Sequence, residues 1–372
     1  MFKRILAFVM ILALAISAFT GCANKAEETK GESTEANNES SDKLKVGFIY
    51  VGPIGDGGWT FAHNEGRLYL EEKLGVDTIY KEAVPEGPEV EKVMRDMIDQ
   101  GAKVIFATSF GYMDYMEKVS KEYPDVKFLH CSGYKTTENM ANYFGRMYEP
   151  RYLSGIVAGM KTESNKIGYV AAFEIPEVIR GINAFTLGVR SVNPEAKVVV
   201  RWTHTWYDPA KEKEAAKSLL DEGADIIAQH QDTAGPQQAA EEAGAFAIGY
   251  NTDSFDKAPK AYMTAPVWNW GPYYVEQVKA AIEGNWESHS YWGGMKDEIV
   301  EIGPLSENAP EGASDKVEEA KKKILSGELN IFAGPIKNQE GTIVIEDGKA
   351  LTDGEMLSID WFVEGVEGKI EK

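Results

Sequence analysis

The 372-residue chain contains little cysteine and little positive charge. Its 2 cysteines, Cys22 and Cys131, are too few for a structural zinc site. Its 39 lysines and arginines are outnumbered by 59 aspartates and glutamates, which gives a formal net charge of −20 at pH 7. This balance repels phosphate backbones, so we expect no nucleic-acid partner and no basic membrane-binding face. The length instead predicts two soluble domains, each able to bury a core.

The chain also lacks an apolar run that is long enough to form a permanent transmembrane helix. The apolar stretch at residues 5–19 is shorter than the roughly 20 residues that a bilayer requires. Basic residues precede it, and Thr20-Gly21-Cys22 follows it. This order is typical of a secretory signal peptide, and residues 19–22 resemble a bacterial lipobox. We therefore expect a signal peptide over residues 1–22, with Cys22 acylated as the membrane anchor.

Residues 23–43 contain no large apolar side chain and consist mostly of Glu, Ser, Thr, Asn and Lys. Such a segment cannot bury enough apolar surface to fold, so we expect a disordered tether. The folded body is predicted to begin at about Leu44.

Two pairs of similar segments recur at nearly the same spacing, which indicates an internal duplication. Residues 45–50 and 166–171 lie 121 residues apart, and residues 97–105 and 219–227 lie 122 residues apart. Each half is predicted to run strand, helix, strand, helix, strand, with third strands at residues 126–130 and 246–250.

Alternating strands and helices predict an α/β fold with two doubly wound parallel-sheet domains joined by a hinge. We expect the first domain to comprise residues 44–148 plus about 267–305. The second is expected to comprise residues 149–266 plus about 306–372.

Six loops are expected at the carboxyl ends of the predicted strands, where ligands bind in such folds. They cover residues 51–59, 108–112, 131–134, 173–178, 229–235 and 251–255. The default ligand site is therefore a cleft between the two domains.

The glycine-rich loop before Trp59 does not have the spacing of a phosphate loop or of a dinucleotide-binding loop. Asp56 in this loop would also repel a phosphate. It could accept hydrogen bonds from ligand N–H groups, or it could cap the helix that begins near Trp59. Both roles are compatible.

Aromatic and polar residues share the expected cleft loops. Stacking on an aromatic face suits a flat heterocycle or a sugar ring, and each ring could alternatively belong to a core. The candidate ligand-binding residues are Asp56, Trp59, Phe110, Tyr112, Phe173, Gln231, Asp232, Asn251, Asp253 and Trp268.

Catalytic and metal motifs are not visible in this sequence. His63, His204 and His230 have no accompanying metal-binding motif, and Ser109 and Ser132 lack a nucleophile elbow. We expect no metal, no cofactor and no catalytic residue.

Several segments together resemble the basic membrane protein family of ABC-importer substrate-binding lipoproteins. They are Lys45-Val-Gly-Phe-Ile with Gly55-Asp-Gly-Gly-Trp59, residues 143–155, Ile248-Gly-Tyr-Asn-Thr-Asp253 and residues 360–366. The resemblance implies a type I periplasmic-binding-protein fold. It further implies that the protein works as a lipid-anchored extracytoplasmic monomer that delivers a small molecule to a permease.

Family members that bind purine nucleosides hold the base between aromatic rings and acids, and a lysine contacts the ribose. By this resemblance, Asp56, Trp59 and Phe110 match base-binding positions, and Asn251 stands where an aspartate grips the ribose. Trp268 stands in place of the lysine, and an indole would occupy the room that a sugar needs. We therefore expect a free base, adenine. A purine nucleoside receptor, a sugar receptor, a nucleosidase and an adhesin are the alternatives.

Overall fold

The computed structural model describes residues 43–371. The expected signal peptide, the expected lipidation site Cys22 and all of the expected tether except Lys43 lie outside the described residues. None of the helices within the described part is long and apolar enough to cross a membrane.

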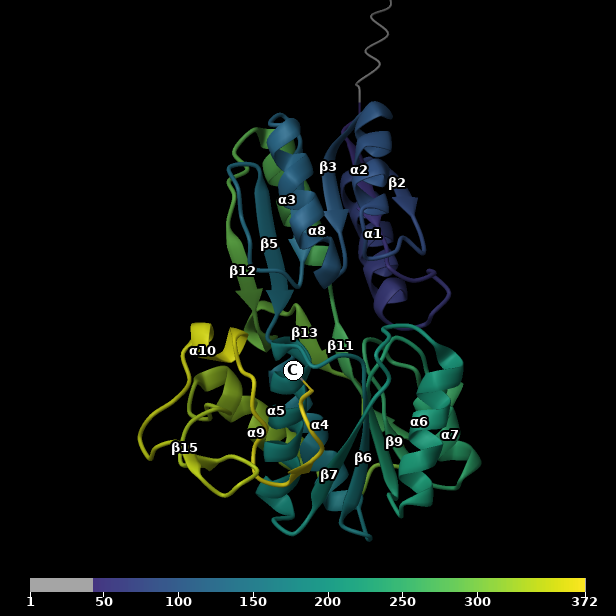
Figure 1. Cartoon of the computed structure of the whole chain (residues 1–372), viewed down its shortest axis with the longest axis vertical. Helices are drawn as coiled ribbons and strands as arrows, with labels where there is room; N and C mark the ends of the chain where they lie inside the picture. Colours follow the sequence, from purple (N-terminus) through teal and green to yellow (C-terminus); the bar gives the residue numbers. More distant parts are fainter. Residues whose placement is uncertain (1–42, 372) are drawn as a thin grey trace, which may run out of the picture. The chain divides into compact units, whose positions relative to one another are not determined.

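A six-stranded sheet forms the first lobe, with the order β12-β5-β4-β3-β1-β2. Every neighbouring pair in this sheet is parallel. Helices flank this sheet in the upper part of Figure 1. The strands are β1 (Lys45–Ile49), β2 (Asp77–Lys81), β3 (Ala102–Ala107), β4 (Lys127–Cys131), β5 (Met140–Gly145) and β12 (Ser290–Gly293). The helices are α1 (Trp59–Leu74), α2 (Glu89–Asp99), α3 (Met113–Glu122) and α8 (Gly271–Glu283), with a 3-10 turn η1 (Phe110–Tyr112).

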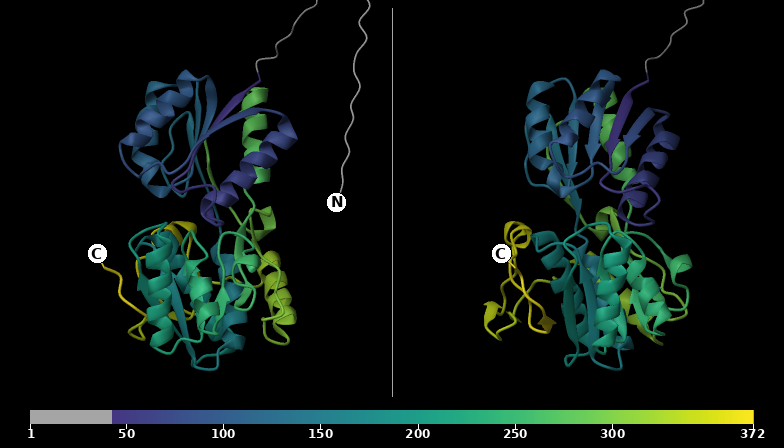
Figure 2. Two further views of the ribbon diagram at one scale, coloured as in Figure 1. Left: turned by 90° about the vertical axis from the view of Figure 1, so that its right-hand side faces the viewer. Right: turned by 45° about the vertical axis from the view of Figure 1, so that its right-hand side comes forward.

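A second six-stranded parallel sheet, with the order β10-β9-β8-β6-β7-β16, forms the second lobe. Its strands are β6 (Lys166–Ala171), β7 (Lys197–Trp202), β8 (Ile226–His230), β9 (Phe246–Ile248), β10 (Tyr262–Thr264) and β16 (Val366–Glu367). Its helices are α4 (Tyr148–Lys161), α5 (Pro176–Val192), α6 (Pro209–Asp221), α7 (Gly235–Glu242), α9 (Ala313–Ser326) and α10 (Asp353–Leu357). The views in Figure 2 show helices on both faces of each sheet.

The two sheets have equivalent strand orders, because β4-β3-β1-β2 corresponds to β9-β8-β6-β7. Local geometry repeats as well. Gly101 and Gly223 end α2 and α6, and both have φ +94°, a conformation that favours glycine. The duplication predicted from the sequence therefore corresponds to a repeated fold.

The sequence predicted three strands in each half, and this number was wrong. The repeated unit contains a further strand, β2 or β7, after its first helix, and β5, β12, β10 and β16 extend the sheets. The edge strand β2 has the sequence Asp-Thr-Ile-Tyr-Lys and is mostly exposed, so it carries only a weak apolar pattern. The predicted third strands correspond to β4 and β9.

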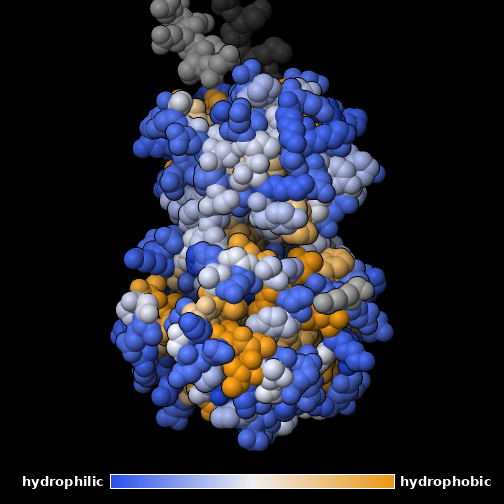
Figure 3. All heavy atoms as spheres, turned by 60° about the vertical axis from the view of Figure 1, so that its left-hand side comes forward, coloured by the Kyte–Doolittle hydropathy of each residue, from blue (hydrophilic) through white to orange (hydrophobic). Residues whose placement is uncertain are grey.

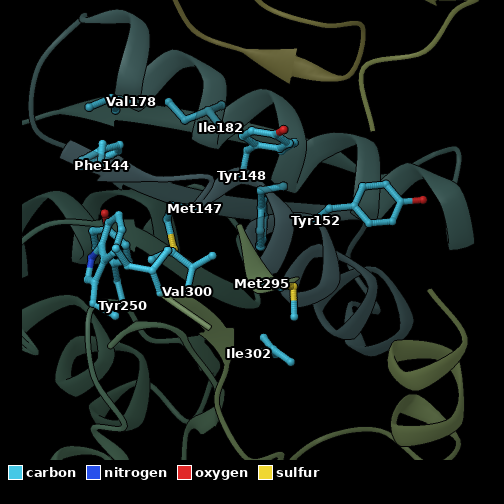
Figure 4. Close-up of a cluster of buried hydrophobic side chains, with 14 of the residues drawn as sticks. Phe144, Met147, Tyr148, Tyr152, Val178, Ile182, Tyr250, Met295, Val300 and Ile302 are labelled. Carbon is cyan, nitrogen blue, oxygen red and sulfur yellow. The ribbon is translucent and has the colours of Figure 1, made fainter. Parts of the chain in front are cut away.

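The chain passes between the lobes near a small antiparallel ladder. This ladder joins β11 (Pro266–Trp268) to β13 (Val300–Ile302), which lie between the two sheets in Figure 1. Buried apolar side chains beside it, including Phe144, Met147 and Val300, connect the ladder to the second-lobe helices (Figure 4). The remaining elements are β14 (Ile336–Lys337), β15 (Ile343–Ile345), η2 (Phe255–Lys257) and η3 (Met295–Asp297).

On the face shown in Figure 3, the two lobes differ in surface hydropathy. The first lobe is largely hydrophilic on this side, whereas hydrophobic residues gather over the second lobe.

Candidate functional site

A cavity with an empty volume of about 330 Å³ lies between the loops at the carboxyl ends of the two sheets. This is the place where an open α/β fold binds its ligand. We call it the cleft cavity. It is lined by Val51, Trp59, Ser109, Phe110 and Ser132 from the first lobe, and by Glu177, Trp206, His230, Asp232 and Tyr250 from the second.

Trp59 forms a fixed wall on the first-lobe side. Its indole N–H donates to the carbonyl oxygen of Thr108 at 2.7 Å, and its ring meets Trp268 edge to face at a centroid distance of 5.7 Å. Phe110 begins the η1 turn, three residues after the end of β3. The two rings therefore enter the cavity from adjacent strand ends.

The second-lobe wall carries the acids. Glu177 lies in the first turn of α5, and Asp232 follows β8. Beside them, Tyr250 packs on His230 at a centroid distance of 4.6 Å. Of the ten lining residues, two are acidic and none is Lys or Arg. The cavity therefore favours ligands with hydrogen-bond donors and disfavours phosphates.

Asp232 is the acid with unused hydrogen-bonding capacity. It is only 5% exposed, and its Oδ2 has no hydrogen-bond partner among the described residues. Burial, followed by the charges of Asp56 and Glu212, raises the pKa of this carboxyl. A buried and unpartnered acceptor is costly, so a ligand donor would stabilise it.

Glu177 and Ser132 connect the lobes across the cavity. The hydroxyl of Ser132 donates to Glu177 Oε2 at 2.6 Å. Glu177 Oε1 lies 3.4 Å from His230 Nε2. Burial lowers the pKa of His230 to about 4, which leaves the imidazole neutral at physiological pH.

The lobes also touch through backbone at the cavity rim. The hydroxyl of Thr252 donates to the carbonyl oxygen of Gly57 at 2.6 Å. A methyl group on Gly58 would lie 2.2 Å from the carbonyl oxygen of Asp232, so this close approach requires glycine. The structure therefore represents a form in which the two lobes are in contact.

Three of the ten residues predicted to bind ligand line the cleft cavity: Trp59, Phe110 and Asp232. The other seven are placed elsewhere, and each has a structural partner.

Asp56 caps the first helix. Its carboxylate accepts hydrogen bonds from the backbone N–H groups of Gly58, Thr60 and Phe61 at 2.8–2.9 Å. This is the capping alternative left open by the sequence. Burial raises the pKa of Asp56, although these three N–H groups oppose the shift.

Asn251 and Trp268 form a pair behind the Trp59 wall. The indole N–H of Trp268 donates to Asn251 Oδ1 at 3.0 Å, and the ring stacks on Trp270 at 4.3 Å. The expected position of Trp268 in the ligand space is therefore corrected. Its ring packs edge to face against Trp59, because the hydrogen bond to Asn251 and the stacking on Trp270 hold it behind the cavity wall.

The remaining four predicted residues make contacts of their own. Tyr112 is buried and donates to the carbonyl oxygen of Val84, and Phe173 packs on Trp206 at a centroid distance of 5.1 Å. Gln231 is buried and donates to Thr203 at 2.5 Å, and Asp253 accepts from the N–H of Phe255 at 3.2 Å.

The sequence prediction missed seven lining residues: Val51, Ser109, Ser132, Glu177, Trp206, His230 and Tyr250. Most of them fall within the six loops that the sequence analysis selected. Position in the loop could have identified several of them, because a residue next to a strand end lies closer to the cleft than residues further along the loop. Trp206 and Tyr250 lie outside those loops.

A possible cation-binding group lies elsewhere. Glu174, His204 and Glu371 bring ligand atoms to within 4.8 Å of one another, but His204 and Glu371 are exposed. These residues do not line the cleft cavity.

Comparison with known proteins decides the family. Residues 43–333 match the family described as ABC transporter substrate-binding protein, PnrA-like. The chain belongs to this family. This chain shares its fold with a solved solute-binding protein of an ABC transporter system from Aeropyrum pernix K1. That structure superposes with a TM-score of 0.68 at 22% identity and covers 78% of this chain and 94% of its own. The fold is therefore of the type I periplasmic-binding-protein class, as the sequence predicted.

Two relatives of this chain have names that refer to different ligands. A purine-binding protein of Brucella abortus (strain 2308) is 44% identical over 333 residues, covering 89% of this chain and 95% of that protein. A protein of Haloferax volcanii, named provisionally as the glucose-binding protein of an ABC transporter, is 41% identical over 341 residues. That alignment covers 91% of this chain and 84% of the relative.

Proposed function

We propose that this substrate-binding protein captures a free purine base, adenine, in the cleft cavity and presents it to the permease of an ABC importer. The observation that carries the proposal is the unpartnered, buried carboxylate of Asp232 within a cavity walled by aromatic rings. A purine offers flat faces for stacking and N–H groups for such an acceptor.

The lining chemistry supports a neutral base. Trp59, Phe110, Trp206 and Tyr250 supply aromatic surface, and Glu177 and Asp232 supply acceptors. Adenine would give its exocyclic amine and a ring N–H to these acids. A nucleotide would bring phosphate against two carboxylates, which is electrostatically unfavourable.

Trp268 is not among the residues that line the cleft cavity, so the preference for a base over a nucleoside rests on a different feature. Free adenine offers a ring N–H to an acid in addition to its exocyclic amine, whereas in a nucleoside the sugar occupies that ring nitrogen.

A hexose is the second candidate, because the Haloferax volcanii relative is named for glucose. Sugar hydroxyls could also donate to the two acids and stack on the rings. The purine is preferred because four of the ten lining residues are aromatic, which suits a ligand with two flat faces.

Location and partners follow from the same proposal. Acylated Cys22 would anchor the protein on the extracytoplasmic side of the membrane, and residues 23–43 would let the monomer reach its permease. No covalent step is part of this function.

Isothermal titration calorimetry with adenine, adenosine, guanosine, ribose and glucose tests the proposal. We expect adenine to bind with a dissociation constant in the micromolar range or below, at about −8 kcal/mol or better. Tight binding of adenosine with negligible binding of adenine would reject the free-base version. Binding of glucose alone would favour the second candidate.

A further inference from the structure

A second, smaller cavity lies behind the cleft cavity and shares Glu177, His230 and Tyr250 with it. We call it the inner cavity. Its empty volume is about 220 Å³, and its own lining includes Arg151, Arg180 and Gly181. The side chains of Phe144, Met147 and Tyr148 also border it and are labelled in Figure 4 together with Tyr250.

Arg151 enters the inner cavity with unused donors. The residue is fully buried, and Nη1 donates to the carbonyl oxygen of Gln229 at 2.6 Å. Its Nε and Nη2 have no hydrogen-bond partner among the described residues. One face of its guanidinium stacks on Tyr250 at 3.7 Å from the ring centroid.

His230 supplies another free nitrogen. Its Nε2 lies 3.2 Å from the hydroxyl of Tyr250, and its buried Nδ1 has no partner among the described residues. When Tyr250 donates to Nε2, the proton of the neutral imidazole resides on Nδ1. The contact from Nε2 to Glu177 Oε1 is longer, at 3.4 Å. In that tautomer the unpartnered nitrogens of Arg151 and His230 are all donors, and the carboxylate of Glu177 also lines the cavity.

These donors converge on one point. A methyl group built on Gly181 would lie 3.5 Å from His230 Nδ1 and 3.6 Å from Arg151 Nε. Both distances are ordinary van der Waals contacts, so the space beside Gly181 is open and admits an occupant of atomic size.

The local charge is positive. The charged groups that act on His230 are Arg151, Arg180 and Glu177, which are two cations and one carboxylate. Arg180 is 4% exposed, donates to the carbonyl oxygen of Met356 at 2.8 Å and stacks on Trp292. A buried excess of positive charge is costly unless a negative charge neutralises it. An anion supplies that charge, whereas a water molecule does not.

We propose that the inner cavity binds a small monovalent anion of the chloride class, held by Arg151 and His230 beside Gly181. The anion would neutralise the guanidinium pair directly behind the Glu177–His230 wall of the ligand site. This site is independent of which ligand occupies the cleft cavity.

Crystals of the folded domain grown in sodium bromide without purine test the site by anomalous scattering. We expect a bromide peak within about 3.5 Å of Arg151 Nε, the distance of an N–H to halide contact. Density that refines only as water, or an empty space, would overturn the proposal. A carboxylate-bearing molecule retained from the cell in place of bromide would also overturn it, because the anion would then belong to a ligand.

A variant gives a second test in solution. Gly181→Ala puts a methyl group into the site without a steric clash, and Gly354→Ala adds one to helix α10 where nothing lies within 4 Å. At constant ionic strength, replacing gluconate by chloride should raise the melting temperature of the wild-type protein and of Gly354→Ala, and this shift should vanish in Gly181→Ala. Equal chloride shifts in all three proteins would contradict the proposal.

Discussion

Ser132 donates its hydroxyl hydrogen bond to Glu177 Oε2 at 2.6 Å, and the two residues belong to opposite lobes. Ser132 directly follows β4, whereas Glu177 lies in the first turn of α5. The cavity wall is therefore completed only when the lobes approach each other. We expect closure and ligand capture to be coupled through this contact.

Replacing Ser132 by alanine should weaken ligand binding. The variant loses a hydrogen bond to a charged group, which is worth about 1.5 kcal/mol or more, so we expect roughly a tenfold increase in the dissociation constant. Titration calorimetry with adenine measures it. Ser120→Ala is the control, because Ser120 bonds within the first lobe. An unchanged affinity in Ser132→Ala would show that this contact does not support the bound form.

Replacing Gly58 by alanine should block closure. The added methyl group would lie 2.2 Å from the carbonyl oxygen of Asp232, which is on the other lobe, so the lobes could not reach this separation. We expect at least a tenfold loss of affinity with a nearly unchanged melting temperature.

Gly55→Ala in the same loop is the matched control, since nothing lies within 4 Å of its added methyl group. Small-angle X-ray scattering with adenine should show compaction in the wild-type protein and in Gly55→Ala. Equal compaction and affinity in Gly58→Ala would contradict the closed geometry.

Asp232→Asn should stabilise the empty protein and weaken binding. Burial raises the pKa of Asp232, so the folded state resists its ionisation and loses stability as pH rises above the unfolded value near 3.9. Asparagine removes that cost at pH 7. It also replaces an acceptor oxygen by an NH₂ donor, so we expect about a 10- to 100-fold loss of adenine affinity. Thermal unfolding and calorimetry measure the two effects, and a loss of both stability and affinity would argue for a structural role.

Acid should destabilise the protein through its buried histidines. Burial lowers the pKa of His130 and of His230 to about 4, below the unfolded value near 6.5. As pH falls below about 6.5, the unfolded chain takes up protons first. Their contribution to the free energy of unfolding is therefore complete above about pH 6.5 and is lost progressively as the pH falls toward 4.

Melting temperatures recorded from pH 7.5 to 4.5 measure this effect. His130→Asn should flatten the decline relative to the wild-type protein, and His289→Gln, at a partly exposed histidine, should not. Parallel curves for all three proteins would refute the assignment to His130.

The repeated fold could be predicted because local sequence carries it. The glycines after α2 and α6 end both helices with φ +94°, and the strands that follow contain the apolar runs Val-Ile-Phe-Ala and Ile-Ile-Ala. The short strand β16 has only two residues, Val366 and Glu367, and offers no periodicity to find. Its place beside β7 depends on tertiary contacts.

The site was predictable at the level of loops and less so at the level of side chains. Asp232 and Trp59 follow from their positions beyond strand ends. Trp268 ends the short strand β11, and its hydrogen bond to Asn251 and its stacking on Trp270 hold its ring outside the cavity. Glu177 begins a helix like many other acids, and only the approach of Ser132 from the other lobe makes it a wall of the site.

Mass spectrometry of the small molecule released when the freshly purified, folded protein is denatured tests the central claim most directly. The account predicts a free purine base, adenine, at up to one equivalent per chain, and its loss from Asp232→Asn prepared in the same way. A hexose or an intact nucleoside in that position, retained equally by Asp232→Asn, would contradict it.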